Sequence, residues 1–183
     1  MSTVIGIAGS LREASFNAAL LRAAAELAPP DLKIEIASIT GIPLYDGDLE
    51  KGEGLPQAVS ELKERIARSD GLLLVSPEYN GSLPGVLKNA IDWLSRPAKD
   101  ISRVFGNKPA GLLGATPGRG GTRLSQTAWL PVFRALGVRP WFGKALYLAD
   151  ASRAFDDEGK LIDDAVRSLL SEYLSAFAAY VRA

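Results

Sequence analysis

Short apolar runs alternate with segments of helical periodicity along this chain, and the alternation limits the folds available to it. Each run is flanked by glycine, proline or polar residues, and the run over 71–75 is almost wholly aliphatic. Strands buried on both faces have this character, and they occur in parallel sheets covered by helices. The expected strands are 4–8, 32–38, 71–75, 109–115 and one within 138–148.

Helices are expected between and after these strands. Ser15 can cap the first helix, Pro29-Pro30 ends it, and Pro84 suits the first turn of a later one. The sequence therefore predicts an α/β fold, a doubly wound five-stranded parallel sheet with helices on both faces. No repeat or linker interrupts residues 1–183, which are expected to form a single domain. Apolar spacing places the helices over 15–27, 56–67, 84–94, 124–136 and 166–181, with a glycine-rich loop over 41–54.

The composition removes several classes of chemistry. The chain has no cysteine and no histidine, which excludes disulfides, thiolate metal centres and Ser-His-Asp triads. An enzyme of this composition is expected to have no metal and to place its reactive chemistry on a bound organic cofactor. The formal net charge of +0 argues against a nucleic-acid partner. Because neither a signal peptide nor an apolar stretch of about 20 residues is evident, we expect a cytoplasmic protein without a membrane partner.

The segment GSLREASFN (9–17) leaves the first strand and enters the first helix. Backbone N–H groups and the helix dipole favour an anion at such a junction. Ser10 and Ser15 add hydroxyls, Asn17 an amide and Arg12 a guanidinium suited to a phosphate. The alternative is a helix cap beside a solvated arginine. The segment matches neither GxGxxG nor the P-loop, so a mononucleotide with a terminal phosphate fits better.

A second unusual segment, SPEYNGSLPGVLKNAIDW (76–93), follows the third strand. Its tip is Asn80-Gly81, and Tyr79 can pack against a flat ring, although an ordinary surface aromatic is the alternative. We interpret Lys88 and Asp92 as a solvated i,i+4 pair. Trp93 lies off the main apolar stripe and is predicted to contact another subunit.

A third segment, ATPGRGGTR (115–123), follows the fourth strand. Its glycines allow the backbone to come close to a ligand, and Arg119 and Arg123 can attract a nucleotide phosphate. The alternative is a flexible loop before a helix. Because the carboxyl ends of parallel strands meet at one sheet edge, the three segments together predict an FMN site at the point where the strand order reverses.

The motifs at 9–17, 42–50 and 77–96 resemble those of the NAD(P)H-dependent FMN reductase family, which has a flavodoxin-like fold, and within it the soluble quinone and chromate reductases. The resemblance implies a homodimer or homotetramer with its contact around 80–95. Gly81 stands where some relatives carry an aromatic residue. The implied cofactor-binding residues surround the phosphate, the ring and the ribityl chain: Ser10, Arg12, Ser15, Phe16, Asn17, Pro77, Glu78, Tyr79, Asn80, Gly81, Thr116, Gly118, Gly120 and Gly121.

The expected function is FMN-dependent transfer of hydride from NADPH or NADH to a small-molecule electron acceptor. Flavin N5 would carry the chemistry, so no side chain is assigned a catalytic role. A quinone, a free flavin, an azo compound and chromate are the candidate acceptors. Two alternatives stay open: a non-enzymatic electron carrier of flavodoxin type, and a subunit that binds a nucleotide or partner without redox chemistry.

Two acidic patterns are interpreted as structural. The stretch starting at Asp46 resembles a calcium loop, but its sixth position is Lys51 and its twelfth is Gln57. The clusters 156–158 and 163–164 lie at a turn and at a helix start, where acidic residues are common.

Overall fold

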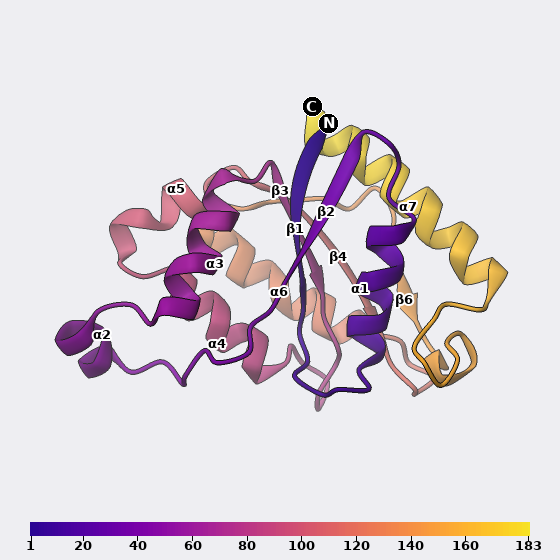
Figure 1. The fold of residues 1–183 in the computed structure, drawn as a ribbon, viewed down its shortest axis with the longest axis horizontal. Helices are drawn as coiled ribbons and strands as arrows, with labels where there is room; N and C mark the ends of the chain where they lie inside the picture. The colour runs from indigo at the N-terminus through magenta and orange to yellow at the C-terminus, as the bar shows by residue number, and fades with distance from the viewer.

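The computed structural model describes residues 1–183 and contains a parallel sheet with helices on both sides (Figure 1). Its central strands are β1 (Ser2–Ala8), β2 (Leu32–Ala37), β3 (Gly71–Val75) and β4 (Pro109–Ala115). The strand order is β2-β1-β3-β4-β5. The chain therefore moves outward from β1 in one direction to β2 and in the other to β3, as in the doubly wound fold that the sequence predicts.

The fifth strand is divided into two short pieces, β5 (Arg139–Pro140) and β6 (Tyr147–Leu148), and both pair with β4. In β4, only residues 111–113 lie between the part that pairs with β5 and the part that pairs with β6. In the other chain segment, residues 141–146 lie between β5 and β6. Because this segment is longer than the stretch of β4 beside it, it bulges away from the sheet edge. The Leu112 carbonyl of β4, which has no strand partner there, instead accepts a hydrogen bond from the Tyr173 hydroxyl at 2.8 Å. The predicted strand within 138–148 is therefore present, but as two short pieces instead of one.

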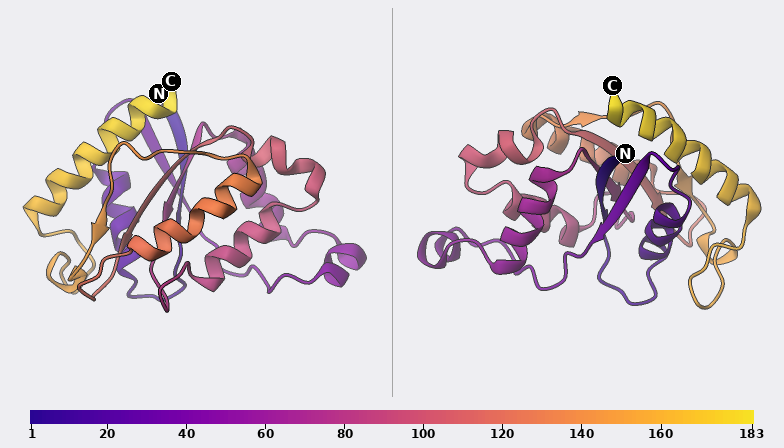
Figure 2. Two further views of the ribbon diagram at one scale, coloured as in Figure 1. Left: turned by 180° about the vertical axis from the view of Figure 1, so that it is seen from behind. Right: turned by 45° about the horizontal axis from the view of Figure 1, so that its top comes forward.

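Seven α-helices accompany the sheet, and two sheet faces form two cores. Leu73 and Val75 of β3 belong to a core with α1 and α7, whereas Leu72 and Leu74 belong to a core with α3, α4, α5 and α6. The further views in Figure 2 show helices on both sides of the sheet. No helix is long and apolar enough to cross a bilayer. The helices are α1 (Phe16–Glu26), α2 (Gly47–Glu53), α3 (Gln57–Arg68), α4 (Gly85–Leu94), α5 (Ile101–Phe105), α6 (Arg123–Leu136) and α7 (Asp164–Arg182), with 3₁₀ turns η1 (Ala98–Asp100) and η2 (Ala151–Arg153).

Helix α2 lies inside the segment that was expected to be a loop. Asp46 caps it by accepting a hydrogen bond from the Asp48 N–H at 2.8 Å. The helix buries none of its residues and projects away from the sheet (Figure 1). Because α2 has no apolar stripe, helical periodicity could not predict it from the sequence. Its position depends on the Asp46 cap and on the contacts of the neighbouring chain with the rest of the fold.

Trp93 supplies one of those anchors, and its predicted role at a subunit contact is wrong. The side chain is 0% exposed, and its indole N–H donates to the Pro43 carbonyl at 2.9 Å. Tyr45 packs edge-on against it, with ring centroids 4.9 Å apart. The chain segment before α2 therefore covers the side of α4 that looked free in the sequence. The predicted Lys88–Asp92 pair is confirmed at 2.7 Å.

Candidate functional site

The loops after β1, β3 and β4 meet at the carboxyl edge of the sheet, at the lower end of the molecule in Figure 1. They enclose a cavity of about 220 Å³. Every predicted residue of the first loop lines it, and so do Pro77, Glu78, Tyr79 and Thr116. Ala115 and Pro117 were not predicted, although their positions on either side of Thr116 were a usable signal. The predicted residues outside the lining are Asn80, Gly81, Gly118, Gly120 and Gly121.

The first loop carries an unusual number of unused backbone donors. Ser15 is the N-cap of α1 and accepts a hydrogen bond from the Ala18 N–H at 3.3 Å, as the capping hypothesis predicts. The Arg12 N–H donates to the Ser10 hydroxyl at 3.3 Å. By contrast, the N–H groups of Leu11 and of residues 13–17 donate to no acceptor in the chain. Together with the positive end of the α1 dipole, these donors form a favourable site for a phosphate.

Asn17 differs from its neighbours because its amide is already engaged. It is buried, its Nδ2 donates to the Ala115 carbonyl at 2.8 Å, and its Oδ1 accepts from the Ala115 N–H at 2.9 Å. The side chain thereby joins the start of α1 to the end of β4. Its contact with a phosphate stays a prediction, for which one Nδ2 hydrogen is available.

The second loop ends in a tight hairpin. The backbones of Tyr79 and Ser82 exchange two hydrogen bonds, of 3.1 and 3.0 Å. Between them, Asn80 and Gly81 have φ values of 51° and 71°, which is the geometry of a type I′ turn and suits an Asn-Gly pair. The Tyr79 side chain is 44% exposed, and its hydroxyl lies 3.5 Å from the Ser10 hydroxyl. Tyr79 thus reaches from the second loop to the first at the mouth of the cavity.

Glu78 holds the second loop against the N-terminus of α6. One carboxylate oxygen accepts from the N–H groups of Leu124 at 2.9 Å and Ser125 at 3.1 Å. A negative charge at this position also interacts favourably with the helix dipole. The sequence implied only that Glu78 lines the ring, and this capping contact was not foreseen.

The third loop is held by backbone hydrogen bonds at its start, whereas its glycine-rich part has free backbone groups. The Thr116 N–H donates to the Leu148 carbonyl at 2.9 Å, and the Asp150 N–H donates to the Gly118 carbonyl at 3.1 Å. A Cβ built on Gly120 meets no atom within 4 Å. The N–H groups of residues 119–121 donate to no acceptor in the chain. The loop can therefore offer its backbone to a ligand.

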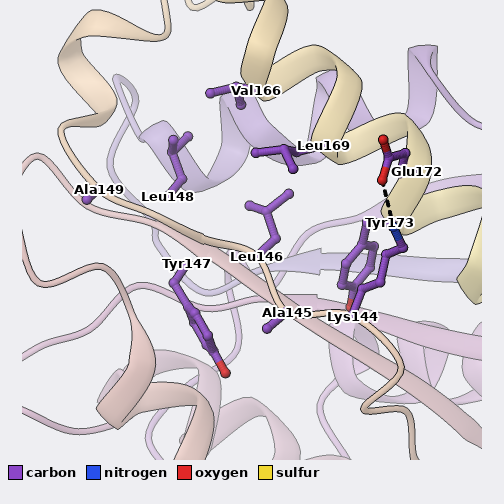
Figure 3. Close-up of a pocket in the computed structure, with 10 residues that line it drawn as sticks. All are labelled: Lys144, Ala145, Leu146, Tyr147, Leu148, Ala149, Val166, Leu169, Glu172 and Tyr173. Atoms are coloured by element: carbon purple, nitrogen blue, oxygen red, sulfur yellow. Dashed lines mark hydrogen bonds and ion pairs between the residues drawn. The ribbon is translucent and has the colours of Figure 1, made fainter.

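A larger apolar cavity lies elsewhere, between the 144–149 segment and α7 (Figure 3). It measures about 360 Å³ and shares no residue with the three-loop cavity. Its charged groups, Lys144 and Glu172, neutralise one another at 2.6 Å (Figure 3). Its only cationic side chain is thus already paired, whereas the three-loop cavity has an arginine in no ion pair and free N–H groups, so the three-loop cavity is the better candidate site.

The sequence matches the family model described as NADPH-dependent FMN reductase over residues 2–153. The chain belongs to this family. An NAD(P)H-dependent FMN reductase of Pseudomonas aeruginosa is 45% identical over 179 residues, covering 98% of this chain and 95% of that protein. A 2-hydroxy-1,4-benzoquinone reductase of a Burkholderia species is 38% identical, covering 96% of this chain and 94% of that protein. FerB, a flavoenzyme NAD(P)H:(acceptor) oxidoreductase from Paracoccus denitrificans, has a similar structure, with a TM-score of 0.88, 32% identity, and coverage of 100% of this chain and 98% of that one.

The residues of this FMN reductase family member fit the cofactor that the family implies. A terminal phosphate needs converging donors, and the first loop supplies free N–H groups beside Arg12. A flavin ring needs a flat apolar contact and backbone donors for its carbonyls, and Tyr79 and the third loop supply them.

The predicted structural role of the acidic pair at 163–164 is confirmed for Asp163. Its carboxylate caps α7 by accepting hydrogen bonds from the Ala165 and Val166 N–H groups at 2.9 and 3.0 Å.

Proposed function

We propose that this protein is an FMN-dependent oxidoreductase that takes hydride from NADH or NADPH and passes two electrons to a small-molecule acceptor, with a quinone as the preferred class. The unused N–H groups of residues 11 and 13–17, next to Arg12 on the three-loop cavity, carry the proposal. The activities for which the Pseudomonas and Burkholderia relatives are named support it. Free flavins, azo compounds and chromate are further candidate acceptors.

The chain's own residues bind and orient rather than react. Bound FMN supplies a ring that accepts hydride at N5 and releases electrons to the acceptor. Arg12, Ser10 and Ser15 hold the phosphate end, and Tyr79 limits the ring at the mouth of the cavity. The free N–H groups of residues 119–121 belong to the third loop at the same sheet edge and can offer donors to a negatively charged ring.

The oligomeric state and the cellular location belong to this proposal. A homodimer or homotetramer is supported by exposed apolar side chains at Val86 of α4 and Leu124 of α6. Equilibrium sedimentation at micromolar concentration should therefore give a mass of at least twice 19.5 kDa. A cytoplasmic location fits an enzyme that consumes NADH or NADPH.

A spectroscopic titration tests the proposed activity. FMN is added to the purified protein, followed under anaerobic conditions by NADPH or NADH and then by 1,4-benzoquinone. We expect the flavin absorbance to bleach with the nicotinamide donor and to return with the quinone. Flavin that binds but is not reduced by either donor would instead favour the electron carrier, and a protein that binds no flavin would refute the cofactor assignment.

A further inference from the structure

A second cavity, of about 550 Å³, adjoins the three-loop cavity. It lies between the start of α1 and the 152–159 segment, and Arg12, Ser15 and Phe16 line both cavities. The shared residues belong to the loop proposed to hold the flavin phosphate. A phosphate bound there therefore lies at the junction, with the second cavity on the side away from the ring.

Two guanidinium groups on this cavity are without a counter-ion. Neither Arg12 nor Arg22 takes part in any ion pair of the structure. The Arg22 guanidinium lies against the backbone of Gly159, because a Cβ built on that glycine would be 2.8 Å from Arg22 Nη2. Both arginines line the same cavity, and neither guanidinium is paired with a carboxylate, so both are available to an anion.

The remaining wall offers different chemistry. Four carboxylates, those of Glu13, Asp156, Asp157 and Glu158, also line the cavity and form no ion pairs. Carboxylates of this kind accept hydrogen bonds from ribose hydroxyls. The half-buried ring of Phe16 adds an apolar surface suited to a base, and the buried ring of Phe155 supports it from behind, with ring centroids 6.1 Å apart.

We propose that the second cavity binds the AMP half of a dinucleotide. The inference rests on the proposed flavin site, because it takes the phosphate of FMN to lie on the first loop. FAD is FMN with AMP joined to that phosphate, so its pyrophosphate would meet Arg12 and Arg22 and its adenosine would enter the second cavity. NADH contains the same AMP half, with one phosphate of its pyrophosphate, a ribose and an adenine.

A comparison of FAD with FMN binding tests the contribution of the AMP half, because only FAD contains it. Dissociation constants for FAD and FMN are measured by quenching of flavin fluorescence on the flavin-free protein. Arg22→Ala should weaken FAD binding about tenfold, as expected for loss of a charged hydrogen bond, and should leave the FMN constant unchanged. Arg68→Ala, which removes an exposed arginine from α3 on the other sheet face, should change neither constant.

A kinetic arm distinguishes FAD from NADH as the source of the AMP half. If NADH supplies it, Arg22→Ala raises the KM for NADH about tenfold but leaves the KM for reduced nicotinamide mononucleotide, which lacks AMP, unchanged. The proposal is overturned if Arg22→Ala leaves both the FAD constant and the NADH KM at their wild-type values. Failure of the flavin assignment itself looks different, because the wild-type protein would then bind neither FMN nor FAD.

Discussion

At the scale of single residues, the site depends on places where two backbones meet with no room for a side chain. A Cβ built on Gly114 of β4 would lie 2.2 Å from the Ser76 carbonyl oxygen and 2.6 Å from Thr122 Oγ1. Ser76 is itself buried, and its hydroxyl lies 2.9 Å from both Ser125 Oγ and Trp129 Nε1. The ends of β3 and β4 are therefore packed against the start of α6, directly below the second and third loops.

We expect Gly114→Ala to lower the free energy of unfolding by at least about 2 kcal/mol, because the clash involves backbone that cannot turn away. Urea denaturation at pH 7 measures the change. Gly52→Ala in α2 is the control: its Cβ meets no atom within 4 Å, and alanine in a helix should be neutral or stabilising by up to about 1 kcal/mol. Equal stabilities of the two variants would contradict the packing described here.

At the scale of elements, single polar side chains join pieces that are far apart in the sequence. Asn17 joins α1 to the end of β4, and Glu78 joins the second loop to α6. On the far side of the sheet, Lys63 of α3 is buried and donates to the Asp100 carboxylate of η1 at 2.6 Å and to the Arg96 carbonyl. These bonds set the positions of loops that have few apolar contacts of their own.

Replacement of Glu78 by alanine tests the first of these joints. We expect Glu78→Ala to lower the free energy of unfolding by about 1–2 kcal/mol, since two N–H groups of α6 lose their acceptor and the helix loses a charge at its N-terminus. Chemical denaturation of the flavin-free protein measures it. Glu53→Ala, at an exposed residue of α2, is the matched control, and a loss no greater than the control's would argue against the cap.

The Lys63–Asp100 contact predicts a dependence of stability on pH. The hydrogen bond from Lys63, with its charge, lowers the pKa of Asp100. Its contribution to stability is therefore complete above the ordinary aspartate pKa of about 3.9 and is lost as the pH falls through the lower pKa of the folded state. We expect the stability difference between wild type and Asp100→Asn to be constant from pH 7 to about pH 4 and to shrink below it. Urea unfolding across this range measures the difference, and a gap that does not shrink between pH 4 and pH 2 would contradict the assignment.

At the scale of the whole molecule, one sheet connects the two cores. The strands are shared by both, because alternate residues of β1, β3 and β4 point to opposite faces. Loss of either helical layer would expose apolar strand residues, which couples the two cores energetically. This arrangement supports the prediction that residues 1–183 behave as a single domain.

Thermal and chemical unfolding test that prediction together with the cofactor. We expect one cooperative transition that coincides by circular dichroism and tryptophan fluorescence. Added FMN should shift the whole transition, by about 2.7 kcal/mol at a free concentration of 100 times the dissociation constant. Two separate transitions, or a flavin effect confined to part of the signal, would contradict a single domain.

The sequence by itself determined the position of the strands that are buried on both faces. The predicted limits of the strands at 71–75 and 109–115 agree with β3 and β4, because an aliphatic run between turn residues has few alternatives to a doubly buried strand. The cap at Ser15 and the three loops at one sheet edge could also be predicted. Strand and helix patterns show that the two kinds of element alternate, which implies a parallel sheet. The loops that follow its strands then lie at one edge.

Only the tertiary structure decided which groups meet. The sequence assigned Trp93 to a subunit contact because helical periodicity shows which face is apolar, whereas its cover comes from Pro43 and Tyr45, about 50 residues earlier in the chain. The same limit applies to Glu78, whose partners lie at the start of α6, 46 and 47 residues away, and to the interruption between β5 and β6, where a side chain of α7 bonds the sheet edge. A hydrogen bond or an aromatic contact depends on distance in space, and a local pattern holds no information about the segment that supplies the partner.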